Sequence, residues 1–314
     1  MIKKIILLFL LILVFIFSLS YFILVKNNPF RFRSHLNFVI LGLDPRDDDF
    51  EKTNTTDTIM FASLNLQNQQ LSLISLPRDL WFYPISSKIN QIYPQSLLAD
   101  QPDFKFIQTN FSDLTGQTID RTITLTTRDL IDFISLIGGV EVNLSQGFVD
   151  TEFPNPDYIK NPSPNIPVYI TVSFPTGPVT LDESNIAYFV RSRKGSDSND
   201  LDRIERQQLL IEAVFQKIQS PQFYQNLQNL ENLYNFYRFH LKTNLSFHDL
   251  LMLSVKLNTK ISNLTLQKIS IPAGDNPQTD LLYYPGRLFE GQWVFLPQDE
   301  KYQGLHQFVR ESLK

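Results

Sequence analysis

The strongest constraint on the fold is an unbroken apolar segment near the N-terminus. From Ile5 to Val25 every residue is apolar except two serines and the amphipathic Tyr21. A helix of this length spans ~31 Å, which is about the thickness of one bilayer core. The run is too long for a cleaved signal peptide, and no small-x-small cleavage site follows it. We therefore expect residues 5–25 to form a transmembrane signal anchor.

The orientation of this segment follows more from chain length than from charge. Two lysines precede the apolar run, and Lys26, Arg31 and Arg33 follow it closely, so the positive-inside count nearly balances. Residues 1–4 are too short to fold by themselves and are expected to be a cytoplasmic tail. Residues 26–36 are expected to be a tether. The bulk of the chain is then extracytoplasmic, attached to the cell membrane by a single span.

Composition excludes several kinds of chemistry. The chain has 314 residues and is 43% hydrophobic, which suffices for one large domain or one domain with an appendage. Its formal net charge of -4 argues against a generally basic nucleic-acid binder. The absence of cysteine excludes disulfides, zinc-thiolate sites and thiol nucleophiles. The four histidines are scattered without a metal-ligand spacing, so we expect no histidine site.

Strand and helix patterns alternate after the tether. Strands are predicted at 37–44, 59–66, 71–76, 121–126, 140–144 and 264–271, and helices at 128–137, 201–218, 225–241, 247–259 and 302–313. The Pro- and Asn-rich segment 151–178 predicts a long irregular loop, and Thr180 with Glu183 predicts a capping box for a short helix through Phe189. The fold class is α/β: an α/β/α layered domain with a central mixed sheet. Its main domain is expected at 37–219, with 220–314 completing or extending it.

The segment 182–208 is unusually rich in arginine. Arg191 and Arg193 are spaced i, i+2, which on an extended segment aims both guanidinium groups the same way. Arg203, Arg206 and Gln207 share one face at the start of the following helix. Arginine presents a planar fork of donors that matches phosphate oxygens, so this cluster predicts a phosphate site. The alternative is an exposed loop neutralised by its acidic neighbours.

Two aspartates precede and follow the turn between the first two strands. Asp44 ends the strand VILGL, and Asp57 lies thirteen residues later at the start of the next strand. If these strands are neighbours, both carboxylates lie at one edge of the sheet, where ligand sites of α/β folds collect. Two carboxylates together with phosphate oxygens and water suit Mg²⁺. The alternative is that both are ordinary turn and cap residues.

A third strand end adds basic residues. In LPRDLW, Pro77 ends the strand and presents Arg78 and Asp79, and Lys88 follows in KIN. Carboxylates and arginines thus gather at strand ends, as expected for a site that binds a metal-bound phosphate ester or anhydride. A structural network of salt bridges is the competing interpretation.

These motifs together resemble the LytR–CpsA–Psr family. LGLDPR, TTDTIM, SLPRD, KIN, LIGGVEV, LDESNIAYFVRSR and DLDRIERQQ occur in the order and spacing of that family over about 37–217. The resemblance implies an α/β/α catalytic domain outside the cytoplasm. It also implies a Mg²⁺-dependent transferase that moves a glycopolymer from a polyprenyl-pyrophosphate carrier to a cell-envelope acceptor, commonly peptidoglycan.

The resemblance assigns roles to individual residues. Asp44 and Asp57 hold Mg²⁺, and the pyrophosphate is clamped by Arg78, Arg191, Arg193, Arg203 and Gln207, with Lys88 and Asp79 nearby. Arg78, Asp79 and Arg203 are the expected catalytic residues, and Asp79 is a candidate general base. The isoprenoid tail occupies an apolar pocket between sheet and helices. An acceptor hydroxyl attacks the anomeric carbon, with polyprenyl pyrophosphate leaving.

Two features depart from the family pattern, and two other functions compete. Thr55 stands where the family often has arginine, and Asp47, Asp48 and Asp49 make the first loop unusually acidic. If water is the true acceptor, the protein is a polyprenyl-pyrophosphate hydrolase. If there is no turnover, it is a regulator that only binds polyprenyl phosphates. A glycan conjugate distinguishes the transferase from both.

Overall fold

The structure is a computed structural model that describes residues 28, 30, 33–44, 55–99, 102–193, 200–257 and 263–314. The expected cytoplasmic tail, the expected anchor and the acidic triplet at 47–49 lie outside these residues. Within the described ranges, no helix is both long and apolar enough to cross a bilayer.

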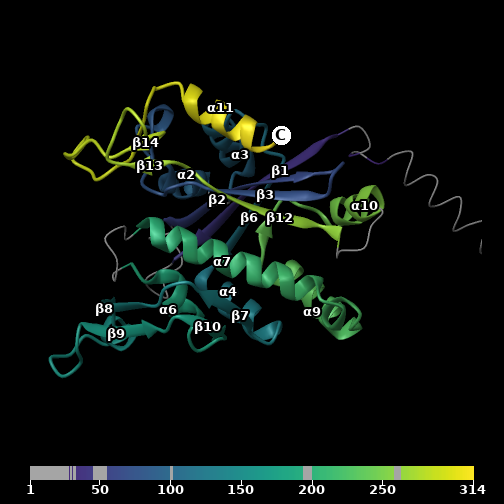
Figure 1. Cartoon of the computed structure of the whole chain (residues 1–314), viewed down its shortest axis with the longest axis horizontal. Coiled ribbons are helices and arrows are strands. Elements are labelled where there is room, and N and C mark those ends of the chain that lie inside the picture. Colours follow the sequence, from purple (N-terminus) through teal and green to yellow (C-terminus); the bar gives the residue numbers. More distant parts are fainter. Residues whose placement is uncertain are drawn as a thin grey trace, which may run out of the picture.

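The centre of the fold is a mixed six-stranded sheet (Figure 1). Its order is β11 (Lys242–Thr243), β6 (Arg121–Thr126), β1 (His35–Leu43), β2 (Thr56–Asn65), β3 (Gln70–Ser75) and β12 (Thr265–Ser270). β1 runs antiparallel to β2 and parallel to β6, and β2 and β3 form the expected hairpin. The predicted mixed sheet is therefore confirmed.

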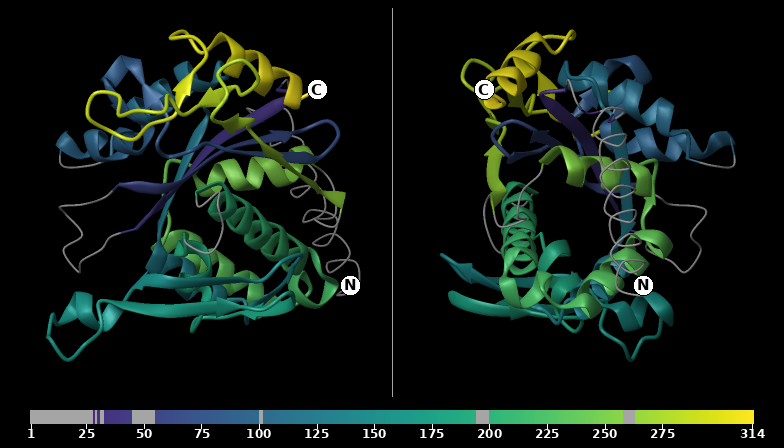
Figure 2. Two further views of the ribbon diagram at one scale, coloured as in Figure 1. Left: turned by 60° about the vertical axis from the view of Figure 1, so that its left-hand side comes forward. Right: turned by 90° about the vertical axis from the view of Figure 1, so that its right-hand side faces the viewer.

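Alternating side chains of the sheet build two cores. Val39 and Leu41 pack with α2 (Ile92–Ser96), α3 (Phe104–Thr115) and α11 (Gln303–Ser312) on one face. Phe38 and its neighbours pack with α10 (Phe247–Leu257) and α7 (Asp200–Gln219) on the other face. The result is the expected α/β/α layering, and Figure 2 shows α7 between the sheet and a further layer of hairpins.

That further layer corrects the prediction for 151–178. β8 (Phe148–Pro154) and β9 (Tyr169–Phe174) form an antiparallel hairpin with α5 (Pro156–Lys160) at its tip. The strands form because Phe153, Val172 and Phe174 point into a third core, while the proline and asparagine residues gather at the tip. Beside this hairpin lie α4 (Thr127–Leu136), β7 (Val140–Leu144), β10 (Gly177–Leu181) and α6 (Ile186–Arg191).

The predicted capping box of Thr180 with Glu183 is also wrong. Thr180 lies inside β10, where it pairs with Glu141 of β7, so it cannot cap a helix. The helix begins only at Ile186, after Asn185, and continues through Arg191. This shift moves Arg191 from a predicted extended segment to the last turn of a helix.

The part of the chain after residue 220 contributes strands and helices to the same fold. β11 and β12 are the two outer strands of the central sheet. The helices are α8 (Pro221–Tyr224), α9 (Leu227–Phe239), α10 and α11, and short strands form at β13 (Ala273–Gly274), β14 (Leu282–Tyr283) and β15 (Leu296–Pro297). Ser246 caps α10 as predicted. Its hydroxyl accepts a hydrogen bond from the backbone N–H of Asp249, and the carboxylate of Asp249 accepts one from the backbone N–H of Ser246.

The first described residues pack against α10. The side-chain amide of Asn28 donates a 2.7 Å hydrogen bond to the carbonyl of Met252. Phe30 is buried in the core that contains Met252 and Leu253. Asn28 and Phe30, which follow the expected anchor in the sequence, are therefore held against this helix.

Candidate functional site

The strand ends bring the predicted acids to one edge of the sheet. Asp44 directly follows β1, and Asp57 is the second residue of β2. Because β1 and β2 are antiparallel neighbours, both residues lie at the same end of the pair, where the register shifts between Gly42 and Leu43. Both side chains line one cavity.

Asp57 is surrounded by three arginines. Its Oδ1 accepts a 2.5 Å hydrogen bond from Arg78 Nη1, and its Oδ2 accepts one of 3.0 Å from Arg193 Nη2. Its backbone carbonyl accepts a 3.3 Å hydrogen bond from Arg203 Nη2. Burial raises the pKa of Asp57, but the positive charges of Arg78, Arg193 and Arg203 outweigh burial and hold the pKa below its usual value. Asp57 is therefore an ionised anchor for the arginine cluster.

Asp44 forms an ion pair with an arginine that does not contact Asp57. Its Oδ2 lies 3.0 Å from Arg191 Nε, and its Oδ1 accepts a 3.1 Å hydrogen bond from the hydroxyl of Thr127 at the start of α4. The i, i+2 argument for Arg191 and Arg193 is thus wrong, because Arg191 ends α6 whereas Arg193 follows in non-helical backbone. The two guanidinium groups nevertheless reach the same cavity.

Asp79 contacts the basic residues around Asp57. Its Oδ1 accepts a 2.7 Å hydrogen bond from Lys88 Nζ, and its Oδ2 accepts one of 3.3 Å from Arg78 Nε. Arg78 therefore lies between the carboxylates of Asp57 and Asp79. Both oxygens of Asp79 are engaged by cations, so Asp79 orients Arg78. Its role as a general base stays a prediction.

Arg203, Arg206 and Gln207 were predicted to share one helix face, but they do not all point into the cavity. Arg203 and Gln207 line the cavity, and Gln207 Nε2 lies 3.4 Å from the carbonyl of Val190. Arg206 donates instead to the carbonyl of Ser192, and its guanidinium stacks 4.3 Å from the centroid of the Phe148 ring. Burial lowers the pKa of Arg206 despite nearby acids. Arg206 joins α7 to β8 and α6 and is not part of the cavity wall.

The cavity itself has a volume of about 930 Å³ and two different regions. Its charged region is lined by Asp44, Asp57, Arg191, Arg193, Arg203 and Gln207. Arg78, Asp79 and Lys88 do not line the cavity, and Arg78 is joined to it through its ion pair with Asp57. Its apolar region is built by strands β1 and β2, helices α4 and α7, and the β8–β9 hairpin. The apolar lining includes Ile40, Met60, Leu130, Phe133, Phe153, Tyr169, Leu210, Ile211 and Val214. From Arg203 to Val214 the cavity follows α7 for ~16 Å.

Asp150 is a cavity residue that the sequence analysis missed. It is 2% exposed, and its Oδ2 accepts a 3.1 Å hydrogen bond from the backbone N–H of Arg193. Asp150 thereby fixes the backbone from which Arg193 reaches Asp57. In the sequence, Asp150 could have been recognised as an acid at an inward-facing position of a strand, but the prediction of an irregular loop for 151–178 concealed that strand.

Thr55, the departure from the family pattern, directly precedes β2.

The donor set at this edge suits a hard cation. Among the described residues, no group of three or more His, Cys, Asp or Glu side chains could hold a metal alone. Asp44 and Asp57 offer carboxylate oxygens, each with lone pairs beyond those that the arginines use. Mg²⁺ typically takes one or two carboxylates and completes its shell with phosphate oxygens and water. The chemistry of these residues therefore fits Mg²⁺ together with a phosphate ligand.

Comparison with known proteins places this geometry in context. Residues 24–306 match the model of the LytR_cpsA_psr family. A relative from Oceanobacillus iheyensis, named polyisoprenyl-teichoic acid–peptidoglycan teichoic acid transferase TagU, is 23% identical over 88% of this chain and 75% of its own. Relatives of that name from Enterococcus faecalis and Bacillus subtilis match over 62% and 53% of their own lengths.

Solved structures share the fold at low identity. TagV of Bacillus subtilis aligns with a TM-score of 0.60 at 16% identity, covering 90% of this chain and 98% of that one. The structure titled TagT bound to LI-WTA aligns with a TM-score of 0.58 at 17% identity, covering 90% and 91%. These structures have the same mixed α/β architecture with a central mixed sheet.

Proposed function

The chain belongs to the LytR_cpsA_psr family, and from this premise we propose that it transfers a glycopolymer from a polyprenyl-diphosphate carrier to a cell-envelope acceptor such as peptidoglycan. One observation carries the proposal: a single cavity joins a cluster of arginines and carboxylates to an apolar interior. A lipid diphosphate has the same two parts, a charged head and an apolar tail. The name of the Oceanobacillus relative, a polyisoprenyl-teichoic acid–peptidoglycan transferase, supports the same substrate class.

The apolar region suits the isoprenoid tail of the carrier. Leu210, Ile211 and Val214 of α7 line this region together with Ile40 of β1 and Met60 of β2. Burial of each methylene-sized group contributes ~0.8 kcal/mol, so a few isoprene units supply most of the affinity. The tail then holds the diphosphate at the charged region without any contact to the glycan.

The arginines suit the diphosphate. Arg78 and Arg193 each donate to Asp57, and Arg191 donates to Asp44, so all three are already held toward one region. Phosphate oxygens offer the same guanidinium groups stronger, bidentate partners. Asp44 and Asp57 are then available to hold Mg²⁺, which when bound neutralises charge on the phosphates.

Two bonds of the carrier can break at this site. In one route the acceptor hydroxyl attacks the anomeric carbon, loses its proton to a base, and releases polyprenyl diphosphate. In the other it attacks the sugar-side phosphorus, loses its proton, and releases polyprenyl monophosphate with a phosphodiester to the glycan. We favour the second route because phosphoryl transfer needs mainly positioning and charge stabilisation, which an arginine cluster supplies.

Product analysis of the full-length protein in vesicles tests this function. A lipid-linked glycan is supplied with and without a glycan acceptor, and with and without a Mg²⁺ chelator. We expect a covalent glycan conjugate and polyprenyl monophosphate, both dependent on acceptor and metal. Lipid cleavage that ignores the acceptor would establish a hydrolase instead, and tight lipid binding without any product would establish a non-catalytic binder.

Membrane attachment through residues 5–25 is part of the proposal, and an exposed apolar stripe supports it. The stripe consists of Leu227, Leu230 and Tyr234 of α9 and Phe247 and Leu251 of α10, which are 41–80% exposed. The rings of Tyr234 and Phe247 contact each other at 5.4 Å, so the two helices present one surface. Asn28 and Phe30 bring the chain to α10, beside this stripe.

Single-cysteine labelling checks this orientation, since the chain contains no cysteine. Leu230→Cys and Leu251→Cys, labelled with an environment-sensitive fluorophore in the full-length protein, should shift to the blue in vesicles and be quenched by lipid-attached quenchers. Leu98→Cys, at a position that is 86% exposed outside α9 and α10, is the matched control and should remain in water. Equal quenching at all three sites, or none at the stripe, would contradict contact with the bilayer.

A further inference from the structure

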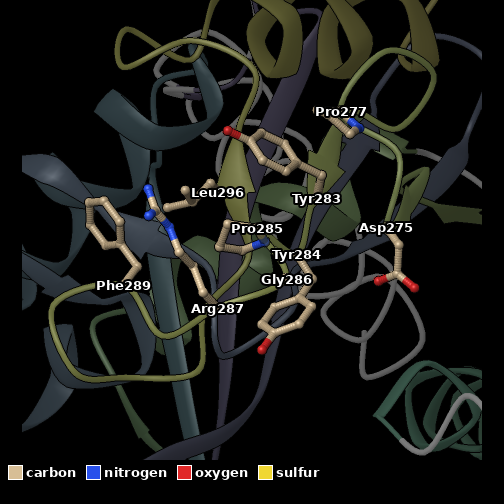
Figure 3. A pocket seen from close by; sticks show the side chains of 9 residues that line it. All are labelled: Asp275, Pro277, Tyr283, Tyr284, Pro285, Gly286, Arg287, Phe289 and Leu296. Carbon is tan, nitrogen blue, oxygen red and sulfur yellow. The ribbon is translucent and has the colours of Figure 1, made fainter.

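A second cavity lies entirely within the C-terminal part of the chain. It has a volume of about 580 Å³ and is formed by the segment between Asp275 and Leu296. In Figure 3, Phe289 and Asp275 lie at opposite ends of the row of labelled side chains, with Tyr283, Tyr284 and Arg287 between them. None of these residues lines the cavity that contains Asp57.

This second cavity is attached to the strand end that carries Arg78. The backbone N–H of Phe295 donates a 2.9 Å hydrogen bond to the carbonyl of Asp79, and the N–H of Trp81 donates one of 2.8 Å to the carbonyl of Phe295. The ring of Phe289 contacts that of Trp81 edge-on at 5.2 Å. The segment that forms the second cavity is therefore hydrogen-bonded to Asp79, the residue next to Arg78.

The walls combine aromatic surface with two exposed ionic groups, Arg287 and Asp275. Tyr284 of the cavity wall stacks on Trp293 with ring centroids 3.5 Å apart and planes 3° from parallel. Trp293 does not itself line the cavity and remains 52% exposed. Within the described part of the chain, no hydrogen bond or ion pair engages the side chains of Arg287 and Asp275. An exposed aromatic pair contributes little to the stability of the core, so folding stability alone does not explain why Tyr284 and Trp293 stack here.

Saccharides have the chemistry that such walls recognise. A pyranose ring presents an apolar face of C–H groups that packs on aromatic rings, and a rim of hydroxyls that pairs with charged or polar side chains. Arg287 can donate to ring substituents, and Asp275 can accept from hydroxyls.

We propose that the cavity between Asp275 and Leu296 is a saccharide-binding subsite that holds a glycan chain beside the transfer site. The role of this subsite in transfer rests on the proposed function, whereas its ability to bind saccharides does not. The glycan comes either from the acceptor strand or from the polymer on the carrier, since both present sugar rings near the diphosphate. The subsite orients that chain so that its reacting group faces the segment of Arg78.

Binding of a soluble chito-oligosaccharide to the full-length protein in detergent tests the chemistry. The protein has two tryptophans, and each contacts a cavity residue: Trp293 stacks on Tyr284, and Trp81 contacts Phe289. A ligand-dependent change in intrinsic fluorescence therefore reports on the cavity. We expect saturable binding that Tyr284→Ala and Arg287→Ala each weaken about tenfold. Phe239→Ala, which removes an exposed aromatic ring from α9, is the control and should bind normally. Unchanged binding in both test variants would overturn the subsite.

Transfer kinetics identify the source of the glycan. A rise in the KM for acceptor with unchanged KM for carrier in Trp293→Ala would assign the subsite to the acceptor strand, and the reverse pattern would assign it to the carrier polymer. Unchanged KM values for both in Trp293→Ala and Arg287→Ala would overturn its role in transfer. Failure of the wild-type protein to transfer glycan would refute the proposed function, while the oligosaccharide titration would still decide whether the subsite exists.

Discussion

Replacing Arg78 by alanine is expected to lower the rate of glycan transfer about a hundredfold, which corresponds to the loss of one charge-assisted contact that strengthens in the transition state. Arg78 lies between Asp57 and Asp79, with Nη1 2.5 Å from Asp57 Oδ1. The proposed diphosphate takes this guanidinium as charge develops on the leaving oxygen. The variant should have a lower kcat but should still bind the carrier, because the isoprenoid tail continues to bind. The measurement is the rate of conjugate formation at saturating carrier.

Arg121→Ala is the matched control for this variant. Arg121 also forms an ion pair with an aspartate, 2.9 Å from Asp249, but Asp249 does not line the cavity, whereas Asp57, the partner of Arg78, does. Both variants lose an arginine–aspartate pair, so both can lose stability, but only Arg78→Ala should lose transfer. Arg78→Lys keeps the charge without the planar fork and should recover part of the rate. Equal transfer rates in Arg78→Ala and Arg121→Ala would contradict the role of Arg78.

Val214→Trp is expected to weaken binding of long-chain polyprenyl diphosphate about a hundredfold. Val214 lines the apolar region, and a tryptophan there fills space that the tail would occupy. Displacing about four methylene-sized groups from the cavity costs ~3 kcal/mol. The measurement is the dissociation constant for carriers of increasing chain length, in the full-length protein.

Short-chain carriers provide the control within the same variant. A carrier with a tail too short to reach Val214 should bind the variant and the wild type equally well, since the charged region is intact. Circular dichroism should confirm that the larger side chain leaves the fold intact, because overpacking a core costs typically 1–3 kcal/mol. Equal losses for short and long carriers would mean that the cavity does not hold the tail.

Local sequence signals were sufficient for much of the charged region. Strand ends place Asp44, Asp57 and Arg78 at one edge of the sheet, because the alternation of apolar residues sets where each strand stops. The helical period from Leu201 onward placed Arg203 and Gln207 on one face of α7. These predictions needed only the pattern of neighbouring residues.

Contacts between distant segments could not be predicted in this way. Arg191 ends a helix instead of lying on a strand, and Asp150 lies on a hairpin whose Pro- and Asn-rich tip dominates the local composition. The apolar lining comes from five elements that are far apart in the sequence. The pairing of Phe295 with Asp79 has no local signal, because one pair of backbone hydrogen bonds leaves no periodic pattern.

The most direct test of the account is a crystal structure of the protein with a polyprenyl diphosphate. We expect the phosphates within hydrogen-bond distance of Arg78, Arg193 and Arg203, and the first isoprene units between α7 and the sheet. A diphosphate bound elsewhere, with these arginines still paired to Asp57, would contradict the account.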